Sequence, residues 1–238
     1  MISINLRLAA PTHGAPYRAC VANHAQNFVT IKQPIMKQEN DNTEINSEEE
    51  ITDPYQTIAH LFTAADVPSY RKIIKQAIKA ACSDRVWTKR DPSSLLWFFD
   101  LLESAINAAY LINKDKKKSP FSISREDLFN PDLYSSKQSN APDWESFPRT
   151  LSVKEFIDPY LVFKRFFRYH SLSEWKMELD DIRCYALGKD SFYDSSIDFD
   201  ALRIYLHLTK LIEAAHLIDV REVTHVDGRI KPKVSAKP

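Results

Sequence analysis

The chain has 238 residues, of which 44% are apolar and 27% are charged, and its 32 basic and 32 acidic side chains give a formal net charge of zero. This balance is typical of a globular protein of one or two domains, and it argues against strong general affinity for nucleic acids or membrane surfaces. We also expect no membrane span, because no apolar run approaches the roughly 20 residues that one needs.

The glycines and cysteines exclude several kinds of site. Gly14, Gly188 and Gly228 are far apart, which excludes the glycine-rich loops that bind phosphates and dinucleotides. The three cysteines are also scattered and form no CxxC pair. They predict neither disulfides nor a zinc site, and they favour a reducing, cytoplasmic location.

The first 52 residues differ in composition from the rest of the chain. Residues 1–38 contain no Asp or Glu, whereas residues 39–53 contain seven acids and no base. We predict that residues 1–52 are a disordered or mis-assigned N-terminal extension that ends in an acidic linker. A cleaved organellar targeting segment is the alternative, although Pro11 and Pro16 would interrupt an amphipathic helix there.

Two stretches of the chain read almost alike. "EITDPYQTIAHLF" begins at Glu50 and "EFIDPYLVFKRFF" begins at Glu155, an offset of 105 residues. An offset of 106 aligns "INAAYLIN" (106–113) with "IEAAHLID" (212–219). Two matches in the same order at nearly the same offset indicate an internal duplication, with repeats at about 50–113 and 155–219.

Each repeat is predicted to form three helices. The first begins at Asp-Pro-Tyr, where the Asp carboxylate caps unpaired N–H groups and proline suits the first turn. The second begins near Asp66 in one copy and near Ser171 in the other, and the third covers about 92–113 and about 199–219. Because a unit of about 62 residues buries too little surface alone, we predict an all-α six-helix bundle with an approximate internal two-fold.

The predicted domain boundaries follow from the repeats. We expect one all-helical domain over residues 53–220, in which repeat one (53–113) and repeat two (152–220) flank a connector (114–151). Residues 221–238 are predicted to be either a basic tail or a short hairpin with Asp-Gly in its turn.

Within the connector, we predict a short helical turn at 124–129. We also expect the aromatic residues Trp144 and Phe147 to anchor the connector to the bundle.

The candidate binding residues lie where copy two departs from copy one. Copy one reads "TIAHLFTAAD" where copy two reads "VFKRFFRYHS". Cations interleaved with aromatic rings can bind nucleic acid through phosphate pairing and base stacking. The competing interpretation is that the phenylalanines belong to the core while the cations cover a solvated face. The candidates are Lys164, Arg165, Arg168, Tyr169 and His170.

Arg165 and His170 also form an R-x4-H spacing, which is similar to the R-x4–6-H motif of the HEPN ribonucleases. The resemblance implies a small helical bundle that cleaves RNA phosphodiesters in a cleft formed by dimerisation, with this Arg and His beside the cleft. That family usually has a polar residue after the Arg, where this chain has Phe166. Copy one has His60 at the position of Arg165 and lacks the motif.

Glu213 and His216 have the E-x-x-H spacing of di-metal helical bundles. A di-metal site would need a second such motif, and copy one has Asn107 and Tyr110 at the matching positions. We therefore interpret Glu213 and His216 as a surface-exposed or locally hydrogen-bonded pair, and we predict no metal and no cofactor.

No arrangement of catalytic residues is recognisable, and the adjacent acids Asp180 and Asp181 would point in different directions on a helix. The sequence therefore favours a non-catalytic intracellular interaction or scaffold module that binds an unknown protein partner or itself. A nucleic-acid-binding or HEPN-like RNA-cleaving protein that uses residues 164–170 is the alternative. A helical metal enzyme with Glu213 as a ligand is a third class.

Overall fold

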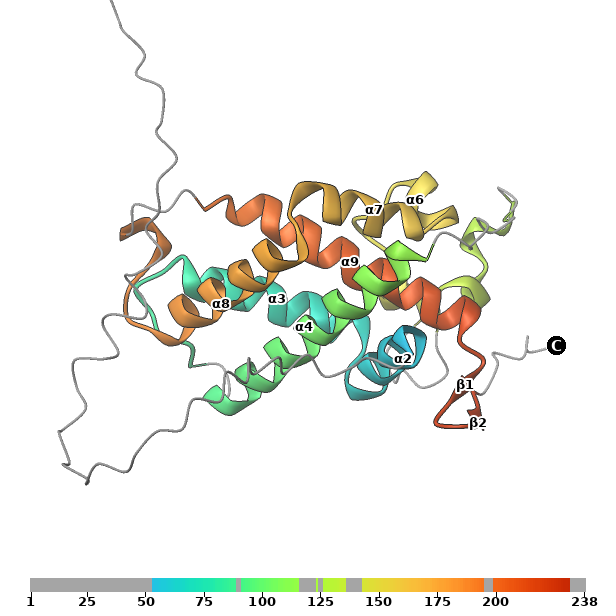
Figure 1. Cartoon of the computed structure of the whole chain (residues 1–238), viewed down its shortest axis with the longest axis horizontal. Helices are drawn as coiled ribbons and strands as arrows, with labels where there is room; N and C mark the ends of the chain where they lie inside the picture. Colours follow the sequence, from blue (N-terminus) through green and yellow to red (C-terminus); the bar gives the residue numbers. More distant parts are fainter. Residues whose placement is uncertain are drawn as a thin grey trace, which may run out of the picture. The chain divides into compact units, whose positions relative to one another are not determined.

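All residues that the computed structural model describes belong to one compact unit, residues 47–238. They are residues 53–88, 91–115, 123, 126–135, 143–194 and 199–231. This part of the chain is mostly helical, which confirms the predicted all-α class (Figure 1). The predictions for residues 1–52 lie outside the described residues.

The first half of the domain contains three helices, α2 (Pro54–Ala64), α3 (Val67–Ala81) and α4 (Pro92–Lys114). Each begins with the same chemistry. An aspartate, Asp53, Asp66 or Asp91, accepts hydrogen bonds from main-chain N–H groups of the first turn, and a proline occupies one of the first two helical positions. Both features stabilise a helix start, because they satisfy or remove donors that have no partner within the helix.

The second half contains α7 (Tyr160–Tyr169), α8 (Leu172–Leu187) and α9 (Ala201–Glu222). Ser171 and Glu174 form a reciprocal capping box at the start of α8. Two boundaries differ from the prediction. α7 begins one residue after Pro159, and α9 continues to Glu222 rather than ending at Asp219, because "DVRE" remains compatible with a helix and no breaker follows Asp219.

The connector contains the 3-10 turns η2 (Glu126–Phe129) and η3 (Pro131–Leu133) and the short helix α5 (Asp143–Ser146), and the short helix α6 (Val153–Ile157) follows it. The expectation for its two aromatic anchors is half correct. The ring of Phe147 packs against Tyr134 and Phe156 at centroid distances of 4.9 and 5.7 Å. Trp144 is 65% exposed, because the short helix α5 directs it away from the bundle.

A two-stranded hairpin follows α9. Strand β1 (His225–Val226) pairs antiparallel with β2 (Arg229–Ile230), and Asp227 and Gly228 between them have φ angles of 50° and 74°. Two successive positive φ angles are characteristic of the type I′ turn that suits a two-residue hairpin loop. The side-chain amide of Gln56 on α2 donates to the carbonyl of His225 at 2.9 Å and helps to fix the hairpin.

Helices from the two halves interleave. α3 lies against α8 and α9, α4 lies against α2 and α8, and α7 lies against α9 and α4. Figure 1 shows α3 and α8 side by side, with α9 on one side of the pair and α4 on the other. The 3-10 turn η4 (Phe192–Asp194) lies in the link between α8 and α9. Each half therefore covers its apolar stripes largely with helices of the other half.

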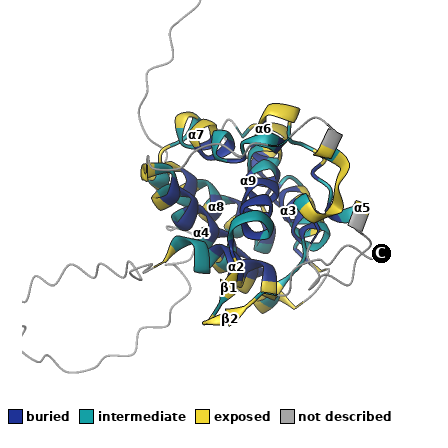
Figure 2. Ribbon diagram, turned by 90° about the vertical axis from the view of Figure 1, so that its right-hand side faces the viewer, coloured by how far each residue is buried: buried dark blue, intermediate teal, exposed yellow. Residues whose placement is uncertain are grey.

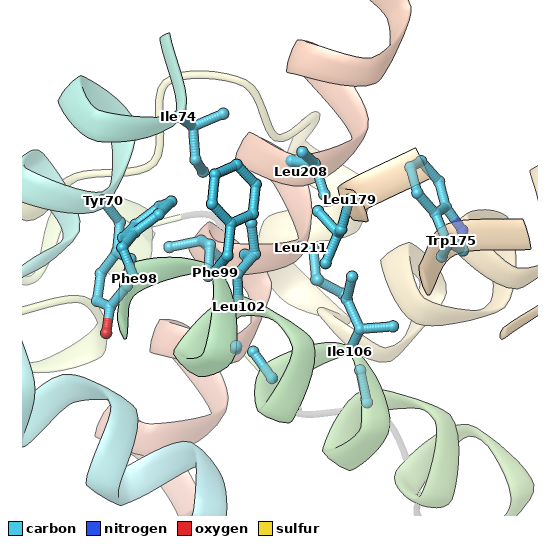
Figure 3. Close-up of a cluster of buried hydrophobic side chains, with 14 of the residues drawn as sticks. Tyr70, Ile74, Phe98, Phe99, Leu102, Ile106, Trp175, Leu179, Leu208 and Leu211 are labelled. Atoms are coloured by element: carbon cyan, nitrogen blue, oxygen red, sulfur yellow. The ribbon is translucent and has the colours of Figure 1, made fainter. Parts of the chain in front are cut away.

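One apolar core fills the space between these helices (Figures 2 and 3). Full burial of a large apolar side chain contributes about 1.5–3 kcal/mol relative to exposure, so this core is the main source of stability. Apolar residues three or four positions apart on the second and third helices of each half form buried stripes: Tyr70, Ile74, Ala77, Ala81, Phe98, Leu102, Ile106, Ala109, Trp175, Leu179, Ile182, Ala186, Ile204, Leu208, Ile212 and Ala215.

The long helix α4 is apolar enough to cross a membrane if only its length and composition are considered. Half of its most apolar window is buried inside the protein, where Phe98, Leu102 and Ile106 form part of the core. A core helix of a globular domain passes the same test, so this helix is weak evidence for a span.

Candidate functional site

The five residues predicted to bind lie on α7 and at its end, but they do not form one group. Lys164 and Arg168 are exposed, and Tyr169 and His170 are half-buried. Arg165 donates to Glu155 of α6 at 2.6 Å, and Lys210 of α9 donates to the same carboxylate at 2.9 Å.

Glu155 turns part of this basic face into an internal ion pair. Burial alone would raise the pKa of Glu155, but hydrogen bonds from Ser152, Lys210 and Arg165 outweigh it and lower the pKa to about 2. The carboxylate is therefore ionised, and it neutralises part of the charge that the sequence assigned to a binding face. Arg165 joins α6 to α7, while His170 contacts the rings of Tyr169 and Trp175. The R-x4-H pair therefore has two separate sets of partners.

An aromatic–histidine cluster, formed by Tyr169, His170, Trp175 and His207, lies where α7 meets α9. The ring of His207 stacks on Tyr169 with a centroid distance of 4.4 Å and an interplanar angle of 15°. The Arg203 guanidinium lies 5.5 Å from the centre of the same tyrosine ring. Sequence reasoning missed Arg203 and His207, because only tertiary packing brings α9 to the end of α7.

Burial lowers the pKa of both histidines in this cluster. Lys210, His170 and Arg203 lower the pKa of His207 further, whereas Glu174 partly opposes the lowering at His170. Both imidazoles are therefore mainly neutral near pH 7. They can stack and share hydrogen bonds, but the exposed arginines must supply the positive charge.

A second polar site is buried between α3 and α9. Arg71 Nε donates to Glu213 Oε1 at 2.8 Å, and its two terminal nitrogens donate to the carbonyls of Glu145 and Phe147 at 2.7 and 2.8 Å. Glu213 also accepts from the amides of Arg149 and Thr150, both at 2.9 Å. The pair thus binds the main chain of residues 145–151, which we call the strap.

The space between α3 and α9 that the strap fills is called here the strap groove. Beside it lies a separate apolar cluster in which Leu217 of α9 packs with Tyr134 of the connector and Phe156 of α6. Arg221 donates to the carbonyls of Leu133 and Phe156 at 2.9 and 2.6 Å. Arg71, Glu213 and Arg221 therefore hold the connector and α6 by their main chains.

The interpretation of Glu213 and His216 as an exposed or locally bonded pair is wrong. Both are buried, and both bind segments at least 60 residues away in the sequence. His216 Nε2 donates to the carbonyl of Tyr134 at 2.8 Å, and burial lowers the pKa of His216 to about 4. The prediction failed because nothing in the helix pattern shows that the connector folds over this face of α9.

Asp219 lies further along the buried side of α9 and fixes the end of the hairpin. Its carboxylate pairs with Lys231, whose ammonium group also donates to the carbonyl of Asp219 at 3.2 Å. Burial raises the pKa of Asp219 to about 6, although the contact with Lys231 opposes this rise. On α2, His60 Nε2 and Asp227 Oδ1 of the hairpin form an exposed pair at 3.0 Å.

Two further acids with raised pKa values lie one turn apart on α8. Burial raises the pKa of Glu178 to about 7, with an added contribution from Asp181, and burial also raises the pKa of Asp181. Asp181 therefore interacts with Glu178 as well as with Asp180. The sequence could have shown this, because residues three apart lie on the same face of a helix. These two acids have no histidine or cysteine partner that would extend them into a metal site, since the described residues contain no group of three potential ligands.

A cavity of about 10 Å³ lies between α3, α4, α8 and α9, which is close to the minimum for one water. Its lining is apolar and includes Ile74, Phe99, Ile182 and Leu208. Among the residues that the structure describes, this cavity therefore has no polar side chain that could hold a ligand.

Comparison with protein-family models, with curated protein sequences and with solved structures gave no match for this chain.

Proposed function

We propose that this protein is a non-catalytic interaction module, built from a duplicated three-helix unit with an approximate internal two-fold. The observation that carries the proposal is the use of buried charge. Arg71, Glu213 and Arg221 all bind main-chain groups of other segments of this chain, so these helices carry side chains suited to holding an extended main chain. Its scattered cysteines suit a cytoplasmic location.

Matched hydrogen bonds support the duplication. The Tyr70 hydroxyl donates to the carbonyl of Leu61 at 2.8 Å, and 105 residues later the Trp175 indole donates to the carbonyl of Phe166 at 3.1 Å. The hydrogen bond between an aspartate and the amide two residues later, at the start of the first helix, also occurs in both copies. Asp53 accepts from the amide of Tyr55 at 2.8 Å, and Asp158 accepts from the amide of Tyr160 at 3.2 Å.

Contacts between the two halves support the internal two-fold. Phe62 of α2 meets His216 of α9 edge-on at 4.9 Å, and the matched pair, Phe167 of α7 and Tyr110 of α4, does the same at 5.3 Å. Exchanging α2 with α7, α3 with α8 and α4 with α9 converts the α3–α9 contact into α4–α8 and the α2–α9 contact into α4–α7, and all four contacts occur. Such reciprocity is expected of a two-fold relation between the halves.

The experiment that tests an interaction role is affinity capture with the full chain in nuclease-treated native lysate. We expect one protein to co-purify in near-stoichiometric amount, or the chain to form a dimer by light scattering. A chain that stays monomeric and captures no protein, while untreated lysate yields bound nucleic acid, would contradict the proposal.

Nucleic-acid binding is the second candidate, because the aromatic–histidine cluster lies beside the exposed cations Arg168 and Arg203. Stacked rings next to arginines can hold single-stranded bases and phosphates. Fluorescence anisotropy with a single-stranded RNA would show affinity that falls with salt. Combined Arg168→Ala and Arg203→Ala substitutions should weaken binding at least tenfold, whereas Lys75→Ala on the distant surface of α3 should not.

A further inference from the structure

The internal two-fold that we propose gives the strap groove a counterpart, and the inference below depends on it. We call this counterpart the open groove. It lies where α4 meets α7 and α8, and its residues match those of the strap groove at offsets of 105 or 106. It is lined by Asn107, Tyr110, Leu111 and Lys114 of α4, Phe167 of α7 and Lys176 of α8.

The apolar part of the open groove has lost its cover. Beside the strap groove, Leu217 is 0% exposed beneath Tyr134 of the connector and Phe156 of α6. Its counterpart Leu111 is 37% exposed. The neighbouring ring of Tyr110 is half-buried, whereas its counterpart His216 is buried. Among the described residues, the apolar surface that Tyr134 and Phe156 cover in one half is therefore more exposed in the other half.

The polar part of the open groove is also less covered. Lys176 takes the place of Arg71, and its side chain is 32% exposed, compared with 9% for Arg71. Asn107 takes the place of Glu213 and is half-buried, whereas Glu213 is fully buried. A carboxamide can both donate to a main-chain carbonyl and accept from a main-chain N–H, so Asn107 retains the capacity to bind an extended backbone.

Lysines give the open groove its charge. Lys114 lies 4.3 Å from the centre of the Tyr110 ring, and Lys164, one turn before Phe167 on α7, is exposed where its counterpart Ala59 is buried. Together with Lys176 they make three cations, and Glu103, which pairs with Lys176 at 3.3 Å, offsets one of them. The excess of positive charge favours a ligand with acidic side chains.

We propose that the open groove binds an extended, acidic peptide segment of a partner protein through its main chain. The peptide would run as the strap does, with an aromatic or aliphatic side chain on Leu111 and Tyr110. Its backbone would meet Asn107 and Lys176, and its acidic residues would lie beside Lys114 and Lys164. This is recognition of an extended segment by backbone hydrogen bonds, with pockets for alternate side chains.

The test uses random 12-residue peptides displayed on phage and selected against the full chain. Enriched sequences are synthesised with a fluorophore, and their dissociation constants are measured by anisotropy. We expect the enriched peptides to carry net negative charge and at least one large apolar residue. Leu111→Asp should raise the dissociation constant at least tenfold, because it removes apolar contact and repels the acidic peptide.

Leu206→Asp on α9 is the matched control, since Leu206 is 39% exposed and lies outside the open groove. It should change the dissociation constant by less than about twofold, in keeping with a surface substitution away from the contact. Lys114→Glu combined with Lys164→Glu should also weaken binding and reverse its dependence on peptide charge. Circular dichroism checks that each variant is folded.

The inference is overturned if selection yields no acidic peptide, or if the selected peptides bind equally well to the Leu111→Asp variant. Loss of binding with Leu206→Asp instead of Leu111→Asp would also overturn it and would direct attention to α9. If the Leu111→Asp chain still captures a protein partner from lysate, the interaction role survives and only the assignment of the open groove fails.

Discussion

The strap groove and the proposed open groove differ in how far their polar residues are buried. In the strap groove, Arg71 and Glu213 are almost fully buried and act on the main chain of the connector. In the open groove, Lys176 and Glu103 form a pair at 3.3 Å with about a third of each side chain exposed. A polar residue on these helices is therefore structural where a described segment covers it, and it is accessible to a ligand where none does.

The largest effect is expected for Glu213→Ala. It leaves Arg71 as an unpaired buried cation and removes the acceptor of two strap amides, so it should lower the free energy of unfolding by about 3–5 kcal/mol. Urea unfolding followed by far-UV circular dichroism measures the loss. Glu103→Ala, in the open groove, should cost less than about 1 kcal/mol. Equal losses for the two variants would remove the distinction between the grooves.

The pH dependence of stability should separate His216 from Asp219. The pKa of His216 falls from 6.5 in the unfolded chain to about 4 in the folded protein, so the folded state binds fewer protons. The stability that depends on neutral His216 is complete above pH 6.5 and is lost as the pH falls toward 4. The total loss in the free energy of unfolding is about 3 kcal/mol. Asp219, with its raised pKa of about 6, has the opposite sign, and its contribution falls as the pH rises from 4 to 6.

Other groups, such as Glu178 with its raised pKa of about 7, also titrate in this range, so each variant is compared with the native pH profile. Asp219→Asn should make stability rise more steeply with pH between 4 and 6.5 than in the native protein, because it removes a contribution that falls with pH. His216→Gln should shift the profile in the opposite direction, because it removes a contribution that rises with pH. Urea unfolding at pH 4.5, 5.5 and 6.5 measures both. Parallel profiles for the two variants would show that the buried side of α9 does not titrate as proposed.

Tyr70 and Trp175 test the equivalence of the two halves. Tyr70→Phe removes one hydrogen bond, to the carbonyl of Leu61, and should cost about 1 kcal/mol. Trp175→Phe removes the matched bond and also leaves a void at a fully buried position, so it should cost about 2–4 kcal/mol. Thermal unfolding measures both losses. A negligible effect of Tyr70→Phe would mean that the repeated bond is incidental to stability.

The smallest effect is expected for Asp227→Asn, which removes the charge of the exposed pair between the hairpin and His60 but keeps a side chain that tolerates the positive φ angle of this turn. Both side chains are at least half exposed, so solvent screens the interaction and the loss should stay below about 0.5 kcal/mol. Amide hydrogen exchange in the hairpin is the more sensitive measurement. A loss above about 1 kcal/mol would show that the hairpin contributes to the core more strongly than its exposure indicates.

Local signals predicted the helices well. Asp53 and Asp66 mark helix starts because their carboxylates act on the next few amides, an effect that depends on neighbouring residues alone. The spacing of Tyr70, Ile74 and Ala77 predicts a buried stripe for the same reason. The sequence could also predict that the halves cover one another, because a single three-helix unit is too small to be stable.

The features that the sequence could not predict depend on contacts between residues far apart in the chain. Glu213 looks like a surface residue until Arg149 and Thr150 of the strap reach it, and His207 becomes part of a cluster only when α9 meets Tyr169. Trp144 illustrates the opposite error, because an aromatic side chain in a connector predicts an anchor, while the local turn directs it to solvent. None of these outcomes follows from helical spacing.

The interleaving of the two halves has a consequence for synthesis on the ribosome. The apolar stripe of α3, which includes Ile74 and Ile78, is covered by α8 and α9. Roughly 100 residues separate α3 from α8, so this cover is synthesised later. At about 5–20 residues per second, translation takes about 5–20 s to supply that cover. A nascent chain with only its first three helices complete therefore carries an apolar surface on α3 that α8 and α9 cover later.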